Sequence, residues 1–254
     1  MMLLATIAAV AFIAYALYNV KNLLVSPKVN FLTVRVDKKK ILFVSDLHIP
    51  KSLKTGKKYC VIGEYMEKNN IRLLFILGDL FDDFHVEVSS NQLKVKLREI
   101  IKILKLPPHT FVYITFSSSS HDPKIKREGA KVKQGSVEII ATNNPIRLIA
   151  DNREFYLLHG DLGVKNGALA YLLNKAACFL GYPYFVERSL KKSLRLKEKS
   201  WLIMGHTHAP FIDDNFKLAN TGSWKHYWRS SSDNVILYDS GSLSLINLGG
   251  GINK

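Results

Sequence analysis

Short apolar runs alternate with amphipathic segments through the first half of the chain. Runs rich in β-branched and aromatic residues predict buried strands, whereas apolar residues at helical spacing predict helices that cover a sheet. We expect strands at 31–36, 41–45, 72–77 and 111–116, and helices at 57–69 and 91–105. This alternation is typical of βαβ units, so the chain is predicted to begin as an α/β fold.

Strand-like runs dominate the second half of the chain. Strands are expected at 136–141, 146–150, 154–158, 201–204, 211–218, 234–238 and 243–247, and helices at 165–180 and 186–198. Such a series predicts a second, mostly mixed sheet packed on the first. At 254 residues the chain is long enough for one large domain with a well-buried core, and no internal repeat divides it.

The first twenty residues carry no charged side chain. As a helix they would cover about 30 Å, the thickness of the hydrocarbon core of a membrane. We interpret residues 1–22 as a retained transmembrane anchor, with a cleaved signal or a buried helix as alternatives. Basic residues follow this run, so the positive-inside rule predicts a single-pass protein whose catalytic domain, residues 23–254, lies on the cytoplasmic side.

The chain is strongly basic, with 36 Lys and Arg against 21 Asp and Glu, a net charge of +15. Such a surface attracts anions, including phosphates, nucleic acids and acidic lipid headgroups. Solvated lysines with no partner are the alternative interpretation. The two cysteines, Cys60 and Cys178, are far apart in the sequence and are expected to be reduced. This excludes a disulfide framework and favours a cytosolic domain.

Five of the apolar runs break off into Asp or His. The five segments are ILFVSDLH (41–48), LLFILGDL (73–80), FVYITFSSSSHD (111–122), FYLLHGD (155–161) and WLIMGHTH (201–208). Open α/β sheets place their sites at the carboxyl ends of strands, so these side chains are expected to gather at one edge. Because carboxylates and imidazoles are ligands for transition metals, the pattern predicts a metal site assembled from across the fold.

Three of these strand ends have further features that favour metal binding. Asp46 and His48 are two residues apart, a spacing that can turn both side chains towards one cation. Asp79 follows Gly78, and glycine permits the close backbone approach that a carboxylate shared by two metals needs. The two imidazoles of Gly-His-x-His (205–208) follow a buried run and are expected to be metal ligands.

In chain order the motifs are Asp-x-His, Gly-Asp, His-Asp, His-Gly and Gly-His-x-His. Together they resemble the calcineurin-like metallophosphoesterase superfamily, from about Ile41 to about Trp224. The resemblance implies an α/β (α+β) fold, a four-layer αββα sandwich of two mixed β-sheets. It implies a phosphoester hydrolase, a phosphodiesterase or pyrophosphatase, that uses hydroxide activated by two divalent metal ions. One ion would be held by Asp46, His48, Asp79 and His208, and the other by Asp79, His159 and His206.

The third motif departs from the family pattern. The family usually carries Asn before the His, and here Ser120 stands in that place. A hydroxyl is a poorer ligand than an amide oxygen, so either water completes the second metal site or that site binds more weakly, and Ser120 is left to contact the substrate. The resemblance implies that His121 protonates the leaving group, and Asp122 beside it is expected to orient that imidazole. The mixed ligands favour Mn²⁺, with Fe, Zn or Co as alternatives.

The segment between the fourth and fifth motifs bears on the substrate. It looks most like the UDP-diacylglucosamine pyrophosphatase branch, whose members insert a helical lid there, at about 165–198 in this chain. Arg188 and Lys192 would then contact an anionic headgroup, and the substrate would be a membrane-associated nucleotide- or phosphate-linked lipid. An amphipathic helix that packs on its own core is the alternative. That branch normally carries Arg where His121 stands, which leaves the lipid substrate open.

Two other functions fit parts of the pattern. A nuclease-type phosphodiesterase acting on DNA would keep the His of the third motif, and the positive charge of the chain would steer DNA towards it. The predicted anchor argues against this alternative. A non-catalytic scaffold, with decayed metal ligands, is the third possibility, and Ser120 is the one visible departure that favours it.

Overall fold

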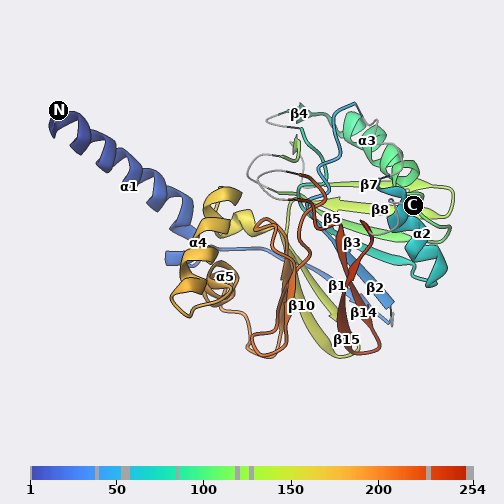
Figure 1. Cartoon of the computed structure of the whole chain (residues 1–254). Helices are drawn as coiled ribbons and strands as arrows, with labels where there is room; N and C mark the ends of the chain where they lie inside the picture. The colour runs from blue at the N-terminus through green and yellow to red at the C-terminus, as the bar shows by residue number, and fades with distance from the viewer. Residues whose placement is uncertain are drawn as a thin grey trace.

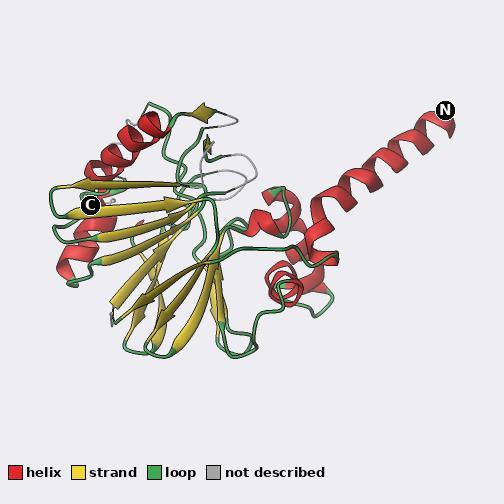
Figure 2. Cartoon of the chain, turned by 180° about the vertical axis from the view of Figure 1, so that it is seen from behind, coloured by secondary structure: helices red, strands yellow, loops and turns green. Residues whose placement is uncertain are grey.

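A computed structural model of the chain describes residues 2–37, 40–52, 58–83, 86–117, 121–125, 129–226 and 230–249. Two large mixed β-sheets lie face to face, and helices cover their outer faces (Figures 1 and 2). The predicted sandwich of two mixed sheets is therefore confirmed.

The larger sheet has seven strands in the order β15-β14-β2-β3-β5-β8-β7. In chain order they are β2 (Lys40–Val44), β3 (Leu73–Leu77), β5 (Phe111–Thr115), β7 (Gly129–Gln134), β8 (Val137–Thr142), β14 (Asn234–Asp239) and β15 (Ser242–Asn247). The central strands β2, β3, β5 and β8 are parallel, and β7, β14 and β15 pair antiparallel. Helices α2 (Cys60–Lys68) and α3 (Ser90–Ile103) pack on one face of this sheet.

The second sheet has six strands in the order β1-β9-β10-β11-β13-β12. They are β1 (Leu32–Val36), β9 (Ile146–Ala150), β10 (Arg153–Leu158), β11 (Trp201–Met204), β12 (Phe211–Asp213) and β13 (Leu218–Asn220). Strands β10, β11 and β13 are parallel. The short helix η1 (Gly160–Leu162) and helices α4 (Gly167–Phe179) and α5 (Phe185–Ser193) connect β10 to β11. A separate pair of strands, β4 (Glu87–Val88) and β6 (Lys124–Ile125), lies beside the larger sheet.

The alternation of side chains along each strand builds two cores. Ile41 and Phe43 of β2 point between the sheets, where Phe43 lies 6.3 Å from the ring of Phe155 in β10. Leu42 and Val44 point to the other face, against helices α2 and α3. Because both faces of the parallel strands are covered, these strands are mostly apolar, and β3 is apolar at every position, which makes them recognisable as continuous runs.

Two expected elements differ in the structure. The strand expected at 211–218 is a hairpin of β12 and β13, because Asp213 accepts a hydrogen bond from the N–H of Phe216 at 2.9 Å and turns the chain. The helix expected at 186–198 ends at Ser193, and Arg195 beyond it adopts a left-handed conformation with φ of 53°. Polar turn residues therefore divided segments that apolar periodicity alone had merged.

Helix α1 (Met2–Leu24) projects from the body, and only its last turns lie beside α4 and α5 (Figure 1). Those turns are held by polar contacts. The side chain of Asn22 donates to the carbonyl of Leu162 at 2.7 Å, and the hydroxyl of Ser193 donates to the carbonyl of Asn22 at 2.5 Å. Asn19 is buried, and its carbonyl accepts from the N–H of Lys165 at 3.2 Å. The end of α1 is thus part of the folded domain.

The membrane span predicted over residues 1–22 is not supported. Among the residues that the structure describes, we found no helix with both the length and the apolar composition that crossing a bilayer requires. Residue 1 and the side chains of residues 2–5, 8, 9, 12 and 13 lie outside the described part of α1. Polar groups of its last two turns are engaged by the protein itself, which a simple tether does not predict.

Truncation separates the two parts of α1. Deleting residues 2–14 should leave the stability unchanged, because the described contacts between α1 and the body lie at Tyr15 and beyond. Deleting residues 2–24 should lower the free energy of unfolding by about 2–4 kcal/mol, because buried contacts and two interhelical hydrogen bonds are lost. Urea unfolding of both truncated proteins and of the full chain measures these free energies. Equal stability of the two truncated proteins would contradict the prediction.

Candidate metal centre

The predicted metal ligands lie at the carboxyl ends of strands from both sheets. Asp46 and His48 follow β2, and Asp79 follows β3 in the larger sheet. His159 follows β10 in the smaller sheet, and His206 and His208 follow β11. All six side chains are buried. The two sheets therefore contribute to one polar centre inside an otherwise apolar sandwich.

Five of these six residues have a left-handed backbone, which is costly for a residue with a side chain. The φ angles are 51° for Asp46, 48° for His48, 47° for Asp79, 74° for His206 and 54° for His208. Backbone hydrogen bonds hold the bends in place: the N–H of Asp46 donates to Gly78 at 3.1 Å, and that of His48 donates to Asp79 at 2.9 Å. Such strain persists where the surrounding structure enforces it, commonly at functional sites.

One group of ligands gathers around Asp46. Its Oδ1 lies 3.1 Å from Nε2 of His208 and 4.0 Å from Nε2 of His48. Nε2 of His48 also lies 3.8 Å from Oδ2 of Asp79. Ligand atoms of Asp46, His48 and His208 all lie within 4.8 Å of one another, close enough to bind a single ion. They are three of the four residues that the resemblance implied for the first metal, and the fourth is Asp79.

A second group gathers around His159. Its Nε2 lies 3.5 Å from Oδ2 of Asp79 and 3.0 Å from Nδ1 of His206. The other nitrogen of each ring faces a backbone carbonyl: Nδ1 of His159 lies 3.1 Å from the oxygen of Leu77, and Nε2 of His206 lies 2.6 Å from that of Val164. A carbonyl only accepts, so each ring carries its proton on that side.

The two facing nitrogens then carry lone pairs aimed at each other, and a proton or a cation is needed between them. Hydrogen bonds from the far side of metal-binding imidazoles to carbonyls are the usual way in which such rings are oriented. Within the described part of the chain, Oδ1 of Asp79 is also buried without a hydrogen bond. Ligand atoms of His159, Asp79 and Asp46 lie within 4.8 Å of one another, so these three residues fit a divalent cation, with Nδ1 of His206 3.0 Å from Nε2 of His159.

Both carboxylates are held in the ionised form. Burial alone would raise the pKa of Asp46, yet His159 and His208 hold that pKa at about 2. Burial opposes ionisation of Asp79 as well, but His159 and His48 bring its pKa below the ordinary value. Two anions buried this close together need positive charge beside them.

The imidazoles divide into two kinds. Burial lowers the pKa of His48 and of His206 to about 4, so both are neutral at pH 7 and able to bind a metal. Burial acts on His159 in the same direction, but Asp79 and Asp46 raise its pKa well above the ordinary value. A proton on His159 thus supplies the positive charge that a bound cation would otherwise supply.

His121 lies at the rim of the centre. Its ring centre lies 4.6 Å from that of His48. The His121 side chain is 17% exposed, whereas all six ligand candidates are buried. With His48 and Asp79 it forms a third group of ligand atoms within 4.8 Å. His121 is therefore placed between the buried centre and the solvent.

The ring of His121 is oriented by Asp82 and not by Asp122. Oδ1 of Asp82 lies 3.0 Å from Nδ1 of His121, and its Oδ2 accepts a hydrogen bond from the amine of Lys225. The Asp122 carboxylate accepts from three backbone N–H groups, those of Asp79 and Ser117 at 2.8 Å and that of Phe81 at 3.1 Å. Adjacent residues in this loop point in different directions, so sequence proximity misassigned the contact.

The pKa values of Asp82 and Asp122 are shifted in opposite directions. Burial and the charge of Asp79 raise the pKa of Asp122 to about 7, against the effect of its N–H donors. Burial also acts to raise the pKa of Asp82, but hydrogen bonds from Lys225 and His121 lower it overall. Asp82 is consequently the carboxylate that is fully ionised beside the ring at neutral pH.

Two of the three expected substrate contacts, Arg188 and Lys192, are not brought to the metal centre. Ser120 lies outside the described residues. Arg188 and Lys192 line a cleft of about 220 Å³ with Tyr182 and Phe185, and none of the metal-ligand candidates lines it. The guanidinium of Arg188 lies 4.0 Å from the ring centre of Phe216. These two cations belong to the outer face of the helical segment.

Sequence patterns missed a buried carboxylate in that segment. Glu187 of α5 is fully buried and accepts hydrogen bonds from the hydroxyl of Thr207 and the side-chain amide of Asn174, each at 2.8 Å. Thr207 stands between His206 and His208, and it also accepts from Asn220 at 3.0 Å. Helix α5 thus packs its inner face on the loop that carries His206 and His208.

No protein-family model and no curated protein matches the chain. Among solved structures, the chain is similar to that of YfcE, a phosphoesterase from E. coli. The two sequences are 17% identical, the alignment covers 83% of this chain and 93% of that chain, and the TM-score is 0.43. The conclusions about the site therefore rest on the geometry given above.

The shared carboxylate can be tested by metal content. Asp79→Asn should remove most of the divalent metal that remains after dialysis, because a neutral amide cannot offset two cations. Asp214 is not among the ligand candidates, and its side chain is 79% exposed. Asp214→Asn should therefore retain the metal content of the unmodified protein. Elemental analysis of the three proteins measures this, and unchanged metal content in Asp79→Asn would exclude Asp79 as a ligand.

The buried carboxylate of α5 can be tested by affinity. Glu187→Ala should weaken metal binding by about 10–100-fold, because the hydroxyl of Thr207 loses the acceptor that orients its loop. Glu187→Gln keeps one acceptor oxygen and should weaken metal binding less. Glu99→Ala, on the outer face of α3, is the matched control and should change nothing. Metal titrations by calorimetry measure this order, and equal affinities in all variants would show that Glu187 does not position the loop.

Proposed function

We propose that this protein is a metal-dependent phosphoester hydrolase with two divalent ions bound between the sheets. The observation that carries the proposal is the pair of facing nitrogens of His159 and His206, 3.0 Å apart and beside the buried carboxylate of Asp79. The other group of ligands, around Asp46, reaches Asp79 through His48, whose Nε2 lies 3.8 Å from Oδ2 of Asp79. Asp79 is therefore the residue proposed to contact both ions.

The donor set determines the metals that fit. A mixed set of two carboxylates and four imidazoles favours Mn²⁺, and Fe, Zn and Co are alternatives. When bound, two such ions lower the pKa of a water between them and offset the charge of the phosphate oxygens. The buried, ionised carboxylates of Asp46 and Asp79 provide the negative charge that holds the ions.

The residues at the rim supply the remaining chemistry. We assign to His121 the proton donated to the departing oxygen, because it is partly exposed and lies against His48. Asp82 holds the ring through Nδ1 and so fixes its orientation at the rim of the centre. Lys225 holds Asp82 in turn and adds a positive charge where a phosphate would enter.

The exposed end of the helical segment supports a substrate at a lipid surface. Phe179 is 91% exposed, and Leu180 and Tyr182 beside it are also exposed. The cleft lined by Arg188 and Lys192 adjoins Tyr182. Apolar side chains beside cations fit the boundary of an anionic membrane, so a membrane-associated nucleotide- or phosphate-linked lipid is the substrate class that we propose.

A substrate panel assayed with Mn²⁺ tests the function. The panel contains bis-p-nitrophenyl phosphate, a nucleotide-linked lipid in vesicles and single-stranded DNA. Hydrolysis of the first two is expected, with loss of activity on chelation of the metal and recovery on adding it back. Turnover of DNA alone, with a steep dependence on salt, would favour the nuclease instead. No turnover of any phosphodiester by metal-loaded protein would favour a non-catalytic scaffold.

The proton donor is tested with two histidines. His121→Asn should lower kcat for bis-p-nitrophenyl phosphate by about 10²–10⁴-fold and leave the metal content unchanged, because its main role is proton transfer. His109→Asn replaces an exposed histidine in the turn before β5 and should keep full activity. A kcat for His121→Asn within a factor of two of the unmodified enzyme would contradict the assignment.

A further inference from the structure

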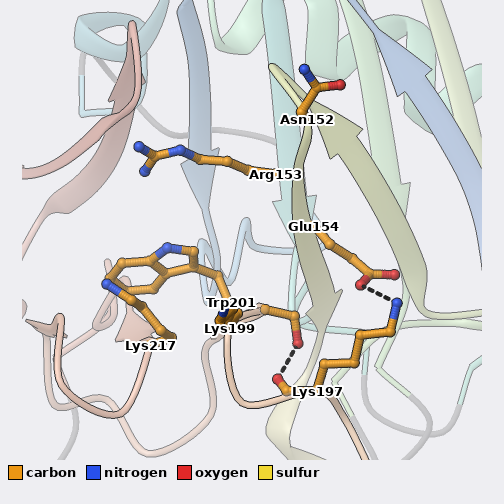
Figure 3. A pocket seen from close by; sticks show the side chains of 8 residues that line it. Asn152, Arg153, Glu154, Lys197, Lys199, Trp201 and Lys217 are labelled. Atoms are coloured by element: carbon orange, nitrogen blue, oxygen red, sulfur yellow. Dashed lines mark hydrogen bonds and ion pairs between the residues drawn. The ribbon is translucent and has the colours of Figure 1, made fainter.

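A pocket of about 440 Å³ lies at the end of the six-stranded sheet opposite to the metal centre (Figure 3). It is formed where three parallel strands begin. The side chains that matter here are Arg153 and Glu154 at the start of β10, Lys197 and Lys199 before β11, Trp201 at the start of β11, and Lys217 before β13. Its volume is within the range of small-molecule sites.

The pocket is strongly cationic. Four basic side chains line it against the single carboxylate of Glu154. That carboxylate is already engaged by Arg147, and Lys197 lies 3.6 Å from it. Across the described ranges of the chain, no carboxylate lies within 4.0 Å of Arg153 or Lys199. Lys217 lies 2.9 Å from Asp214, so the positive charge available to an anion is chiefly that of Arg153 and Lys199.

One wall of the pocket is aromatic and immobile. Trp201 is only 4% exposed, so its indole is held by the core between the sheets. The amine of Lys217 lies 5.2 Å from the centre of that ring. Trp201 lines the pocket with only a small part of its surface, so the cations beside it contribute most to binding, and they suit a ligand that carries phosphate groups.

The pocket is separate from the metal centre and connected to it by strands. Strand β10 runs from Arg153 to the residue before His159, and at about 3.3 Å per residue the two lie roughly 20 Å apart. Strand β11 likewise leads from Trp201 towards His206. An anion bound here cannot be the one that contacts the metal ligands.

We propose that this pocket is a second binding site, specific for a phosphorylated small molecule of about nucleotide size. The phosphate groups would lie between Arg153 and Lys199, the two cations without a carboxylate partner in the described structure. The remainder of the ligand would lie against the wall that Trp201 and Lys217 form. The site does not depend on the hydrolase activity proposed for the metal centre.

Calorimetric titrations in EDTA test the proposal, because chelation removes any metal that would bind phosphate elsewhere. ATP and pyrophosphate serve as probes, and neutral adenosine is the negative control. We expect the unmodified protein to bind ATP, and the double variant Arg153→Ala/Lys199→Ala to bind it at least about tenfold more weakly. Binding of ATP but not of pyrophosphate would identify a nucleotide, and equal binding would identify the phosphate groups alone.

Two matched proteins make the result decisive. Arg98→Ala/Lys133→Ala removes the same charge from exposed positions on α3 and β7 and should bind ATP as the unmodified protein does. Asp79→Asn, altered at the metal centre, should also bind normally. The proposal is overturned if the unmodified protein binds neither anion, if adenosine binds as tightly as ATP, if the control pair loses as much affinity as the pocket pair, or if Asp79→Asn abolishes binding.

Discussion

The buried carboxylates of Asp46 and Asp79 set the constraint on which the centre depends. Each has little contact with solvent, and isolated anions in such a position cost several kcal/mol. The protein surrounds them with imidazoles, one of which, His159, is driven to take a proton. A cation bound between these groups would supply the same positive charge, so folding and metal binding are expected to stabilise each other.

This arrangement requires the backbone to bend at the strand ends. The ligand candidates after β2, β3 and β11 have left-handed conformations, and hydrogen bonds pin the ends of β2 and β3 together. The N–H of Trp224 donates to the carbonyl of Asp46 at 2.9 Å, so the segment after β13 secures the same bend. Helix α5 secures the loop after β11 through Glu187. Residues far from the ligands in sequence thus hold the geometry of the centre.

The layout of the fold and the composition of the centre could be predicted because both depend on local patterns. The buried parallel strands are mostly apolar, and Asp46, Asp79 and His159 lie within two residues of the ends of such strands. Asp82 and Lys225 could not be identified, since their meeting beside His121 depends on how loops 143 residues apart are folded together. Glu187 could not be identified either, because nothing in the helical pattern of its segment marks one carboxylate as buried. Only packing shows that this one carboxylate points inwards.

Anomalous diffraction from crystals grown with Mn²⁺ is the most direct test of the account. We expect two peaks in the anomalous difference map, one between Nε2 of His159 and Nδ1 of His206, and one beside Asp46 and His208, with Asp79 contacting both. A map without a peak between His159 and His206 would show that only a proton is shared there, and the proposal of a two-metal hydrolase would be contradicted.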